Sequence, residues 1–225
     1  VLNNSDPVKI EMGIAIKNLE EFNQKIESIK LNIWLRMNWK NEYMSWNTSN
    51  YEGMDFLAIK PEQVWVPDIE LYNAGGLPEI YTLVGGMNLY NNGEFMWSRP
   101  GIFKFSCPLK LEEFPFDTQS CQMTFGSWVY NNQYLELAPY SDTSKAIDIL
   151  DDFSHSEWEL LDMSYQQQTV NDDSGLPKDT ITYTVRLKRY SHYYQLSMGM
   201  TGVLVFVSFI IMLVAPDNLS RTGTA

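Results

Sequence analysis

Along most of the chain, apolar and polar residues alternate with a period of two. The clearest run is residues 29–39, and similar runs occupy residues 10–16 and 182–188. In the clearest run the apolar series is Ile29, Leu31, Ile33, Leu35, Met37 and Trp39, and the intervening series is Lys30, Asn32, Trp34, Arg36 and Asn38. Strands with one buried face and one solvated face produce this alternation. The pattern therefore predicts a mainly β protein.

Turn-forming residues separate the predicted strands. They lie at residues 74–76, 91–93, 99–101 and 171–177, where Gly, Pro, Asn and Asp are concentrated. Short strands at this spacing are typical of a β-sandwich. We therefore expect one β-sandwich domain over residues 1–194.

The pattern changes near the C-terminus. Residues 196–215 contain no charged side chain, and a stretch of this length forms a helix that crosses about 30 Å of hydrocarbon. A buried core helix is the rival interpretation, but the preceding β domain already looks complete. We therefore predict a transmembrane helix over residues 195–215. No signal peptide begins at Val1, so we expect a mature or trimmed chain that continues beyond Ala225.

Charge and composition narrow the classes of function. The formal net charge is −12, from 16 basic and 28 acidic residues, which disfavours nucleic acid as a partner. The acidity confers solubility or gathers cations. The two histidines, His155 and His192, stand in no nucleophile–base motif. The sequence therefore predicts no enzyme, no metal and no cofactor.

The two cysteines, Cys107 and Cys121, are separated by thirteen residues. A reduced pair, part of a metal site and a disulfide all remain open. A zinc site needs about four ligands, which this chain supplies poorly. A disulfide is favoured, would stabilise by roughly 3 kcal/mol and would indicate an oxidising compartment. Possible glycosylation at Asn47 and Asn3 fits such a compartment.

The cysteine spacing also distinguishes two kinds of membrane-tethered sandwich. An immunoglobulin adhesion domain joins its two sheets through cysteines far apart in sequence, with a tryptophan between them. Here the intervening residues include no tryptophan and instead carry Phe114-Pro115-Phe116-Asp117. An adhesion module is therefore disfavoured.

Several segments together resemble the Cys-loop receptors, the pentameric ligand-gated ion channels, and within them the nicotinic acetylcholine receptor-like subunits. The similarity runs from about Pro7 to Ala225. The segments that carry it are NIWLRMNWKNEYMSWN (32–47), WVPDIELYN (65–73), RPGIFKFSC (99–107), CPLKLEEFPFDTQSC (107–121) and MTFGSWVYNN (123–132).

The resemblance implies a fold and a cellular setting. Residues 1–194 would form an extracellular, ten-stranded, immunoglobulin-like β-sandwich. Residues 195–215 would be the first transmembrane helix, and residues 216–225 an intracellular turn and the start of the pore-lining second helix. The chain would be one subunit of a homo- or hetero-pentamer in the plasma membrane, in contact with lipid, and multi-pass in its full-length form.

The resemblance also implies a ligand site between neighbouring subunits. It assigns Tyr72, Trp128, Tyr165 and Tyr183 to a principal face, and Trp39, Asn88, Met96 and Ser98 to a complementary face. Aromatic rings attract a cation by about 0.5–2 kcal/mol each, so such a box suits a cation such as a quaternary ammonium, while the identity of the small-molecule agonist stays open. The pattern alone favours a place in the hydrophobic core for these aromatic residues, and the motif match reverses that preference for Tyr72, Trp128 and Trp39.

The third principal segment departs from the acetylcholine-binding pattern. The stretch SYQQQTVNDDSGLPKDTITY lacks the two adjacent cysteines, and Asp172 and Asp173 stand near its tip. Acetylcholine is therefore disfavoured as the agonist. Another ligand, for example a cation attracted by these carboxylates or a weakly bound amphiphile, is one alternative. An accessory subunit that supplies only the complementary face is another, and a soluble acetylcholine-binding-protein relative is disfavoured by the apolar span.

Other residues match the parts of the family that couple binding to gating. Phe114, Pro115 and Phe116 would rest on the membrane domain, with Pro115 as a candidate cis proline. Glu21 and Arg189 would form the coupling ion pair, so Glu21→Gln is expected to reduce gating without reducing agonist binding.

Ion selectivity is less clear from the residues after the span. In APDNLSRTGTA, Ser220 stands near the position where cation-selective relatives carry glutamate, Arg221 follows, and Asp217 is the nearest acid. The nicotinic-like first domain gives a weak preference for cations.

Overall fold

The computed structural model describes residues 6–80, 86–150, 153–171 and 175–214. Within them twelve strands form an eight-stranded and a four-stranded sheet. The predicted mainly β, sandwich-like fold is confirmed, but the expected number of ten strands is wrong. Pairing also occurs over two or three residues, as at Glu79–Ile80, and such short contacts leave no alternating pattern in the sequence.

The larger sheet combines most strands of the N-terminal half of the domain with two short strands, β9 and β10, from the C-terminal half. Its path runs β10-β1-β2-β7-β6-β3, with β5 added on β7 and β9 added on β1. Strands β1 and β2 pair antiparallel, whereas β9 and β10 run parallel to β1. The strands are β1 (Val8–Asn23), β2 (Ser28–Lys40), β3 (Phe56–Ile59), β5 (Glu79–Ile80), β6 (Met87–Tyr90), β7 (Glu94–Ser106), β9 (Leu135–Pro139) and β10 (Ile147–Ile149).

The smaller sheet contains β4 and the three long strands of the C-terminal half of the domain. Its order is β11-β12-β8-β4, and all three pairings are antiparallel. The strands are β4 (Ile69–Leu71), β8 (Thr118–Ser127), β11 (Trp158–Asn171) and β12 (Pro177–Arg189). The hydrophobic core contains apolar residues from both sheets, and Tyr183 on β12 donates a hydrogen bond to the carbonyl of Met12 on β1.

The predicted alternation is confirmed where it was clearest. Ile29, Leu31, Ile33 and Met37 on β2 are fully buried, whereas Trp34 is exposed. The turn predicted at 91–93 is also present, with Gly93 in the left-handed region at φ 84°. In β2 the sequence period therefore places the apolar series in the core, while Asn32 of the intervening series is an exception because it is only 6% exposed.

The turn predicted at 99–101 is wrong. Arg99, Pro100 and Gly101 lie inside β7 and pair with β2. Pro100 falls between the part of β7 that pairs with β6 and the part that pairs with β5. Proline is tolerated in strands where a ladder hydrogen bond is not required, so it does not end the strand here.

The helical segments are short except for the last one. The described helices are the 3-10 turns η1 (Glu42–Met44), η2 (Thr48–Asn50) and η3 (Pro61–Gln63), and the α-helices α1 (Thr143–Ala146) and α2 (His192–Val214). At the start of η2, exposed Asn47 accepts a hydrogen bond from the Ser49 N–H. Asn47 is therefore accessible, as a glycosylation acceptor must be.

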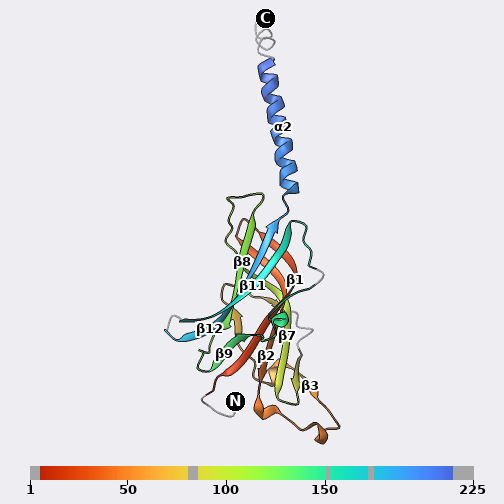
Figure 1. Ribbon diagram of the computed structural model, residues 1–225, viewed down its shortest axis with the longest axis vertical. Helices are drawn as coiled ribbons and strands as arrows, with labels where there is room; N and C mark the ends of the chain where they lie inside the picture. The colour runs from red at the N-terminus through yellow and green to blue at the C-terminus, as the bar shows by residue number, and fades with distance from the viewer. Residues whose placement is uncertain (1–5, 81–85, 151–152, 172–174, 215–225) are drawn as a thin grey trace.

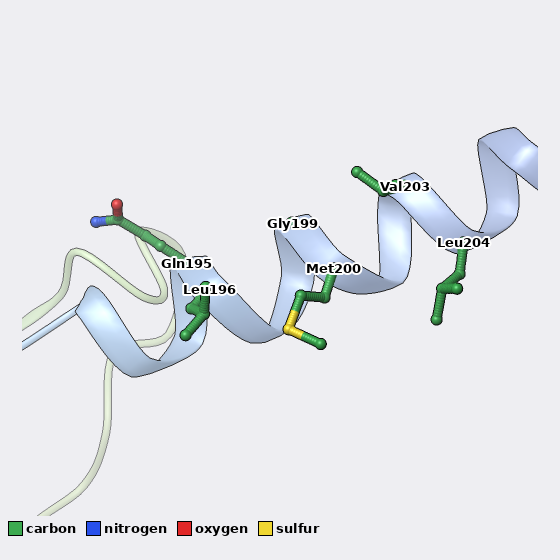
Figure 2. Close-up of a pocket in the computed structure, with 6 residues that line it drawn as sticks. All are labelled: Gln195, Leu196, Gly199, Met200, Val203 and Leu204. Carbon is green, nitrogen blue, oxygen red and sulfur yellow. The ribbon is translucent and has the colours of Figure 1, made fainter.

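Helix α2 extends away from the end of the sandwich (Figure 1). The stretch His192–Leu213 has 22 residues, and its most apolar 18-residue window has a mean hydropathy of 2.3 and no buried residue. It is therefore long and apolar enough to cross a membrane. Leu196, Met200 and Leu204 follow one another along one side of α2 and line a shallow apolar hollow with Gly199 (Figure 2).

Candidate functional site

Two aromatic residues of the predicted principal face lie together. Tyr72 follows β4 and Trp128 follows β8, and their rings are 6.3 Å apart in an edge-to-face arrangement. The side chain of Trp128 is 70% exposed and that of Tyr72 is 36% exposed. Large aromatic side chains exposed to this extent next to each other form a surface suited to contact with a ligand or a partner.

A hydrogen-bond network fixes the backbone around Trp128. The Ser127 hydroxyl donates to Asp68 at 2.7 Å, and the Val129 N–H donates to the other Asp68 oxygen at 2.7 Å. The Tyr72 hydroxyl donates to the Ser127 carbonyl at 2.6 Å. These bonds hold the loop so that Trp128 points outward. Sequence reasoning missed Asp68 and Ser127, because the contact joins residues 59 positions apart.

Gly126 makes room for Tyr72. A Cβ atom on Gly126 would lie 2.6 Å from the Tyr72 hydroxyl, which is closer than carbon and oxygen atoms approach without strain. The absence of a side chain at residue 126 therefore lets Tyr72 reach the Ser127 carbonyl. This is the one position on the principal face where glycine is required by a close approach.

The other two residues predicted for the principal face do not join this pair. Tyr183 is fully buried and its ring is 6.2 Å from that of Tyr165, which is itself partly buried against the core. Burial raises the pKa of the Tyr183 hydroxyl well above its ordinary value. The prediction that Tyr183 lines the ligand site is wrong, because its position on β12 faces the larger sheet. Tyr165 lies opposite Tyr183 on β11, well away from the hairpin tip.

A basic residue lies beside Trp128 instead. Lys178, near the start of β12, donates a hydrogen bond from its Nζ to the Trp128 carbonyl at 2.7 Å. The same part of β12 contacts the loop through the Asn132 N–H, which donates to the Pro177 carbonyl. The third principal segment therefore contributes an ammonium group to the surface formed by Tyr72 and Trp128.

The residues predicted for the complementary face occupy one surface of the larger sheet. Asn88 on β6 lies directly opposite Met96 on β7, and both are exposed. Ser98 is two residues further along β7 and therefore points to the same side. Its hydroxyl is buried and has no hydrogen-bond partner among the described residues. These three predicted residues thus lie together.

Trp39 does not belong to that surface. It is only 3% exposed and stacks on Phe95 at 5.0 Å inside the core. Trp34, which is 38% exposed, lies on the opposite face of β2 and pairs with Pro100, in the row next to Ser98. The prediction that Trp39 lies with Asn88, Met96 and Ser98 is therefore wrong, and Trp34 is the exposed tryptophan on their surface. The positions 34 and 39 differ by an odd number, so the strand period separates them.

An ion pair borders the complementary face. Arg36 lies opposite Ser98 in the pairing of β2 with β7. Its guanidinium donates to Asp148 on β10 at 3.0 Å. This contact links the surface of β2 to the strand after α1.

At the membrane end of the sandwich, Arg189 is buried in an ion pair with Asp117. The guanidinium donates to both carboxylate oxygens, at 2.7 and 2.9 Å, and Gln119 donates to the same carboxylate. Burial opposes ionisation of Asp117, but the hydrogen bonds from Arg189 and Gln119 outweigh it, so the pKa of Asp117 is lowered. Burial likewise disfavours the Arg189 charge, yet its pKa is raised by Asp117.

Aromatic rings surround the same guanidinium. Its carbon lies 4.2 Å from the ring centre of Trp158, 5.1 Å from that of Phe114 and 5.5 Å from that of Tyr194. Trp158 belongs to β11, Phe114 to the loop between the cysteines and Tyr194 to α2. Arg189 therefore joins the sandwich, the Cys-loop and the membrane helix at one point.

The predicted pair of Glu21 and Arg189 is not formed. Glu21 is partly exposed, and its carboxylate accepts from the Lys30 ammonium at 2.7 Å. Hydrogen bonds from Lys30 and Asn23 lower the pKa of Glu21. Asp117, which immediately follows the apolar tip of the Cys-loop, takes the place expected of Glu21, because its carboxylate faces the end of β12.

The loop closed by the two cysteines contacts α2. Cys107 and Cys121 form a disulfide with an S–S distance of 2.00 Å, which confirms that prediction. The Phe114–Pro115 peptide bond is cis. The Phe114 ring lies 5.0 Å from that of Tyr194 in α2, Pro115 is buried and Phe116 is 60% exposed. The tip therefore presents an apolar surface beside the start of the membrane helix.

Some predicted residues lie outside the described part of the chain. These are Asn3, Asp172, Asp173, Asp217, Ser220 and Arg221. Among the residues that the structure does describe, no group of three or more His, Cys, Asp or Glu side chains is arranged to hold a metal ion.

The structure combines a β-sandwich, a disulfide-closed loop that contacts a helix long and apolar enough to cross a membrane, and exposed aromatic residues on two surfaces. The family described as the neurotransmitter-gated ion-channel ligand binding domain matches residues 1–191. The chain belongs to this family, which confirms the resemblance to Cys-loop receptors. It is a family of receptor channels and not of enzymes.

Individual relatives show which branch of the family is similar. The chain is 32% identical to acetylcholine receptor subunit beta-like 1 of Drosophila melanogaster, over 95% of this chain and 41% of the relative. It is 33% identical to neuronal acetylcholine receptor subunit alpha-6 of Pan troglodytes, over 95% of this chain and 42% of the relative. It is 30% identical to neuronal acetylcholine receptor subunit beta-4 of Rattus norvegicus, over 99% of this chain and 44% of the relative. The chain thus spans less than half the length of these relatives.

Proposed function

We propose that this chain is a subunit of a pentameric ligand-gated ion channel in which an agonist binds between neighbouring subunits. The observation that carries the proposal is the presence of two separate exposed surfaces, one formed by Tyr72 and Trp128 and the other by Trp34, Asn88 and Met96. Each surface alone leaves aromatic side chains in water, which is unfavourable. In a cyclic oligomer every subunit has the same orientation in the ring, so the first surface of one subunit contacts the second surface of its neighbour.

The membrane end supports a role in transmission. Arg189 contacts residues of the Cys-loop and of α2, so a displacement of β12 reaches the membrane helix through a buried ion pair and packed rings. Binding near Trp128 involves the other end of the same strand, through Lys178. Strand β12 is thus a physical connection between the ligand surface and the membrane helix.

The proposal also covers the placement of the chain in the membrane and the ions that the channel conducts. Residues 1–194 lie outside the cell, α2 crosses the plasma membrane, and the full-length chain crosses it several times. The channel prefers cations, and this part of the proposal is supported by the resemblance of residues 1–194 to nicotinic receptor subunits.

A second candidate function is that of an accessory subunit. It is favoured by the positions of Tyr165 and Tyr183, which leave Tyr72 and Trp128 as the only predicted aromatic residues exposed on the principal face of the described chain. An accessory subunit would contribute its complementary face to a different partner. The surface of Trp34, Asn88 and Met96 is sufficient for that role.

Expression of the full-length chain alone separates these functions. We expect a pentamer by native mass spectrometry, and currents when a library of small amines, amino acids and amine esters is applied to cells. Replacement of sodium by a large organic cation should abolish inward current. A pentamer that binds ligand but needs a second chain for current would support the accessory role. A chain that stays monomeric alone, and that adds neither binding nor current when it is co-expressed with a related receptor subunit, would contradict both.

A further inference from the structure

We propose that Asn47 carries an N-linked glycan and that the first sugars of this glycan pack on the exposed side chains of Tyr51 and Met54. The inference goes beyond the channel function and rests on it only in placing residues 1–194 outside the cell. The segment concerned joins β2 to β3 and lies at the end of the sandwich opposite α2 (Figure 1).

The side chain of Asn47 is accessible and is held in a defined position. Asn47-Thr48-Ser49 is an acceptor triplet, and Asn47 is exposed. Its Oδ1 accepts from the Ser49 N–H at 3.0 Å, so Nδ2, the atom that is glycosylated, takes no part in this contact. In the transfer, Nδ2 forms a bond to C1 of the first sugar of a lipid-diphosphate-linked oligosaccharide. The lipid diphosphate leaves with the electron pair, and Nδ2 loses one proton.

The turn after Asn47 brings apolar side chains next to the acceptor. The Thr48 carbonyl accepts from the Tyr51 N–H at 3.0 Å and from the Gly53 N–H at 2.9 Å. The Met54 N–H donates to the Tyr51 carbonyl at 2.9 Å. These bonds fold residues 48–54 back on themselves, so that the backbone of Tyr51 lies beside the residue that follows the acceptor.

This turn has no buried side chain of its own. Tyr51 is 57% exposed and Met54 is 44% exposed, and all residues from 49 to 58 are exposed. Trp46, just before the acceptor, packs against the core, and its indole N–H donates to the Met54 carbonyl at 2.8 Å. Hydrogen bonds therefore order the turn, while its aromatic and thioether groups remain in water, which is unfavourable.

A sugar attached to Asn47 suits this surface by its chemistry and by its attachment. One face of a pyranose ring presents C–H groups that pack on apolar and aromatic side chains, while its hydroxyl groups stay in water. The first sugars are neutral, so the nearby acids Glu52 and Asp55 do not repel them. The glycan is tethered four residues from Tyr51, which gives a high effective concentration. Its bulk also keeps a protein surface away from the turn.

Radical footprinting of the full-length chain, purified in detergent from eukaryotic cells, tests the contact. Peptide mass spectrometry first identifies the glycan on Asn47. Oxidation rates of Tyr51 and Met54 are then measured in the glycosylated chain, in the chain trimmed to its first sugar by an endoglycosidase, and in Ser49→Ala, which removes the acceptor triplet. We expect both side chains to react at least about twofold more slowly in the two sugar-bearing forms, because packing removes accessible surface.

Two controls separate the sugar from the substitution. Ser49→Thr keeps the acceptor triplet and should show the wild-type protection. Tyr134 is 64% exposed and bonds to the start of β1, across the larger sheet from β3, so its rate should be the same in every form. If Ser49→Ala does not fold, wild-type chain deglycosylated after purification supplies the sugar-free state.

Two results would overturn the inference. Absence of a sugar from Asn47 would remove the proposed occupant. Equal rates for Tyr51 with and without the sugar would show that the glycan does not pack there. Rates that are equally slow would indicate a protein surface over the turn, such as a neighbouring subunit, and rates that are equally fast would indicate a turn open to water.

The proposed function fails by different results. Currents from a chain without sugar protection of Tyr51 would refute this inference and leave the channel function standing. A chain in which the glycan protects Tyr51, but which neither assembles nor conducts alone or with a related subunit, would support this inference while the channel function fails.

Discussion

At the membrane end of β12, Arg189 is buried with Asp117 and enclosed by rings from three segments, whereas at the other end Lys178 lies beside the exposed Trp128. The first end satisfies its charges within one chain. At the second end aromatic side chains are exposed to solvent, which is typical of a surface that binds a partner. One strand, β12, therefore takes part in two kinds of contact. At one end its contacts are complete within the chain, and at the other end it borders an exposed surface that we propose is one half of a ligand site.

The largest loss of stability is expected when the buried ion pair of Asp117 and Arg189 is broken. Asp117→Ala leaves Arg189 charged and unpaired in a buried position, and such changes cost about 3–5 kcal/mol. Thermal unfolding of the purified full-length chain measures the loss. Glu21→Gln is the matched control, because it removes an exposed carboxylate at the same end, and it should leave the unfolding temperature unchanged. Equal losses in the two variants would contradict the buried pairing.

The two tryptophans of β2 should separate stability from binding. Trp39→Ala empties a core position and is expected to cost about 3–5 kcal/mol. Trp34→Ala lies on the surface and should cost less than about 1 kcal/mol, while weakening ligand binding. Chemical denaturation and ligand titration of both variants provide the comparison. A stability loss in Trp34→Ala as large as that in Trp39→Ala would invalidate the assignment of the two faces.

A smaller effect is expected on the principal face. Gly126→Ala places a Cβ atom 2.6 Å from the Tyr72 hydroxyl, so Tyr72 must move and lose its bond to the Ser127 carbonyl. Overpacking of this kind costs about 1–3 kcal/mol. Gly86→Ala is the control, since a Cβ there meets no atom within 4 Å. If both variants unfold at the wild-type temperature, the close approach of Tyr72 and Gly126 is not maintained in solution.

The smallest expected effect is on how stability changes at acidic pH. The folded-state pKa of Asp117 is lowered, so its pairing stabilises the fold fully above the ordinary aspartate pKa of about 3.9. That contribution is lost as pH falls through the lowered folded-state value. The unfolding free energy of Asp117→Asn should therefore vary less with pH below about 4 than that of the wild type. Parallel pH curves for the two proteins would show that Asp117 does not titrate differently on folding.

Much of the fold was readable from the sequence because one period governs the long strands. Ile29 to Met37 face the core as the alternation predicts, and the turn at Asn92-Gly93 needs the left-handed backbone that glycine allows. The turn predicted at Pro100 failed because the effect of a proline depends on which neighbouring strand is present. That information is not local.

The candidate site was only partly readable for the same reason. The motifs located Tyr72 and Trp128, but they led to Trp39 although the alternation itself assigns it to the core series with Met37. The period of two favoured Trp34 and was the better guide. The pairing of Arg189 with Asp117 joins residues 72 positions apart, and the contact of Lys178 with Trp128 joins residues 50 apart. No local pattern encodes such contacts.

The central claim is that the ligand site is divided between two subunits. Trp128→Ala and Trp34→Ala full-length chains are expressed separately and together, and binding of whichever compound gates the wild-type channel is measured. Each variant alone should lose binding at every interface. Co-expression should restore about a quarter of the wild-type sites, since intact surfaces then meet at some interfaces of the ring. No recovery on co-expression, with normal assembly of the mixed oligomer, would contradict a site shared between subunits.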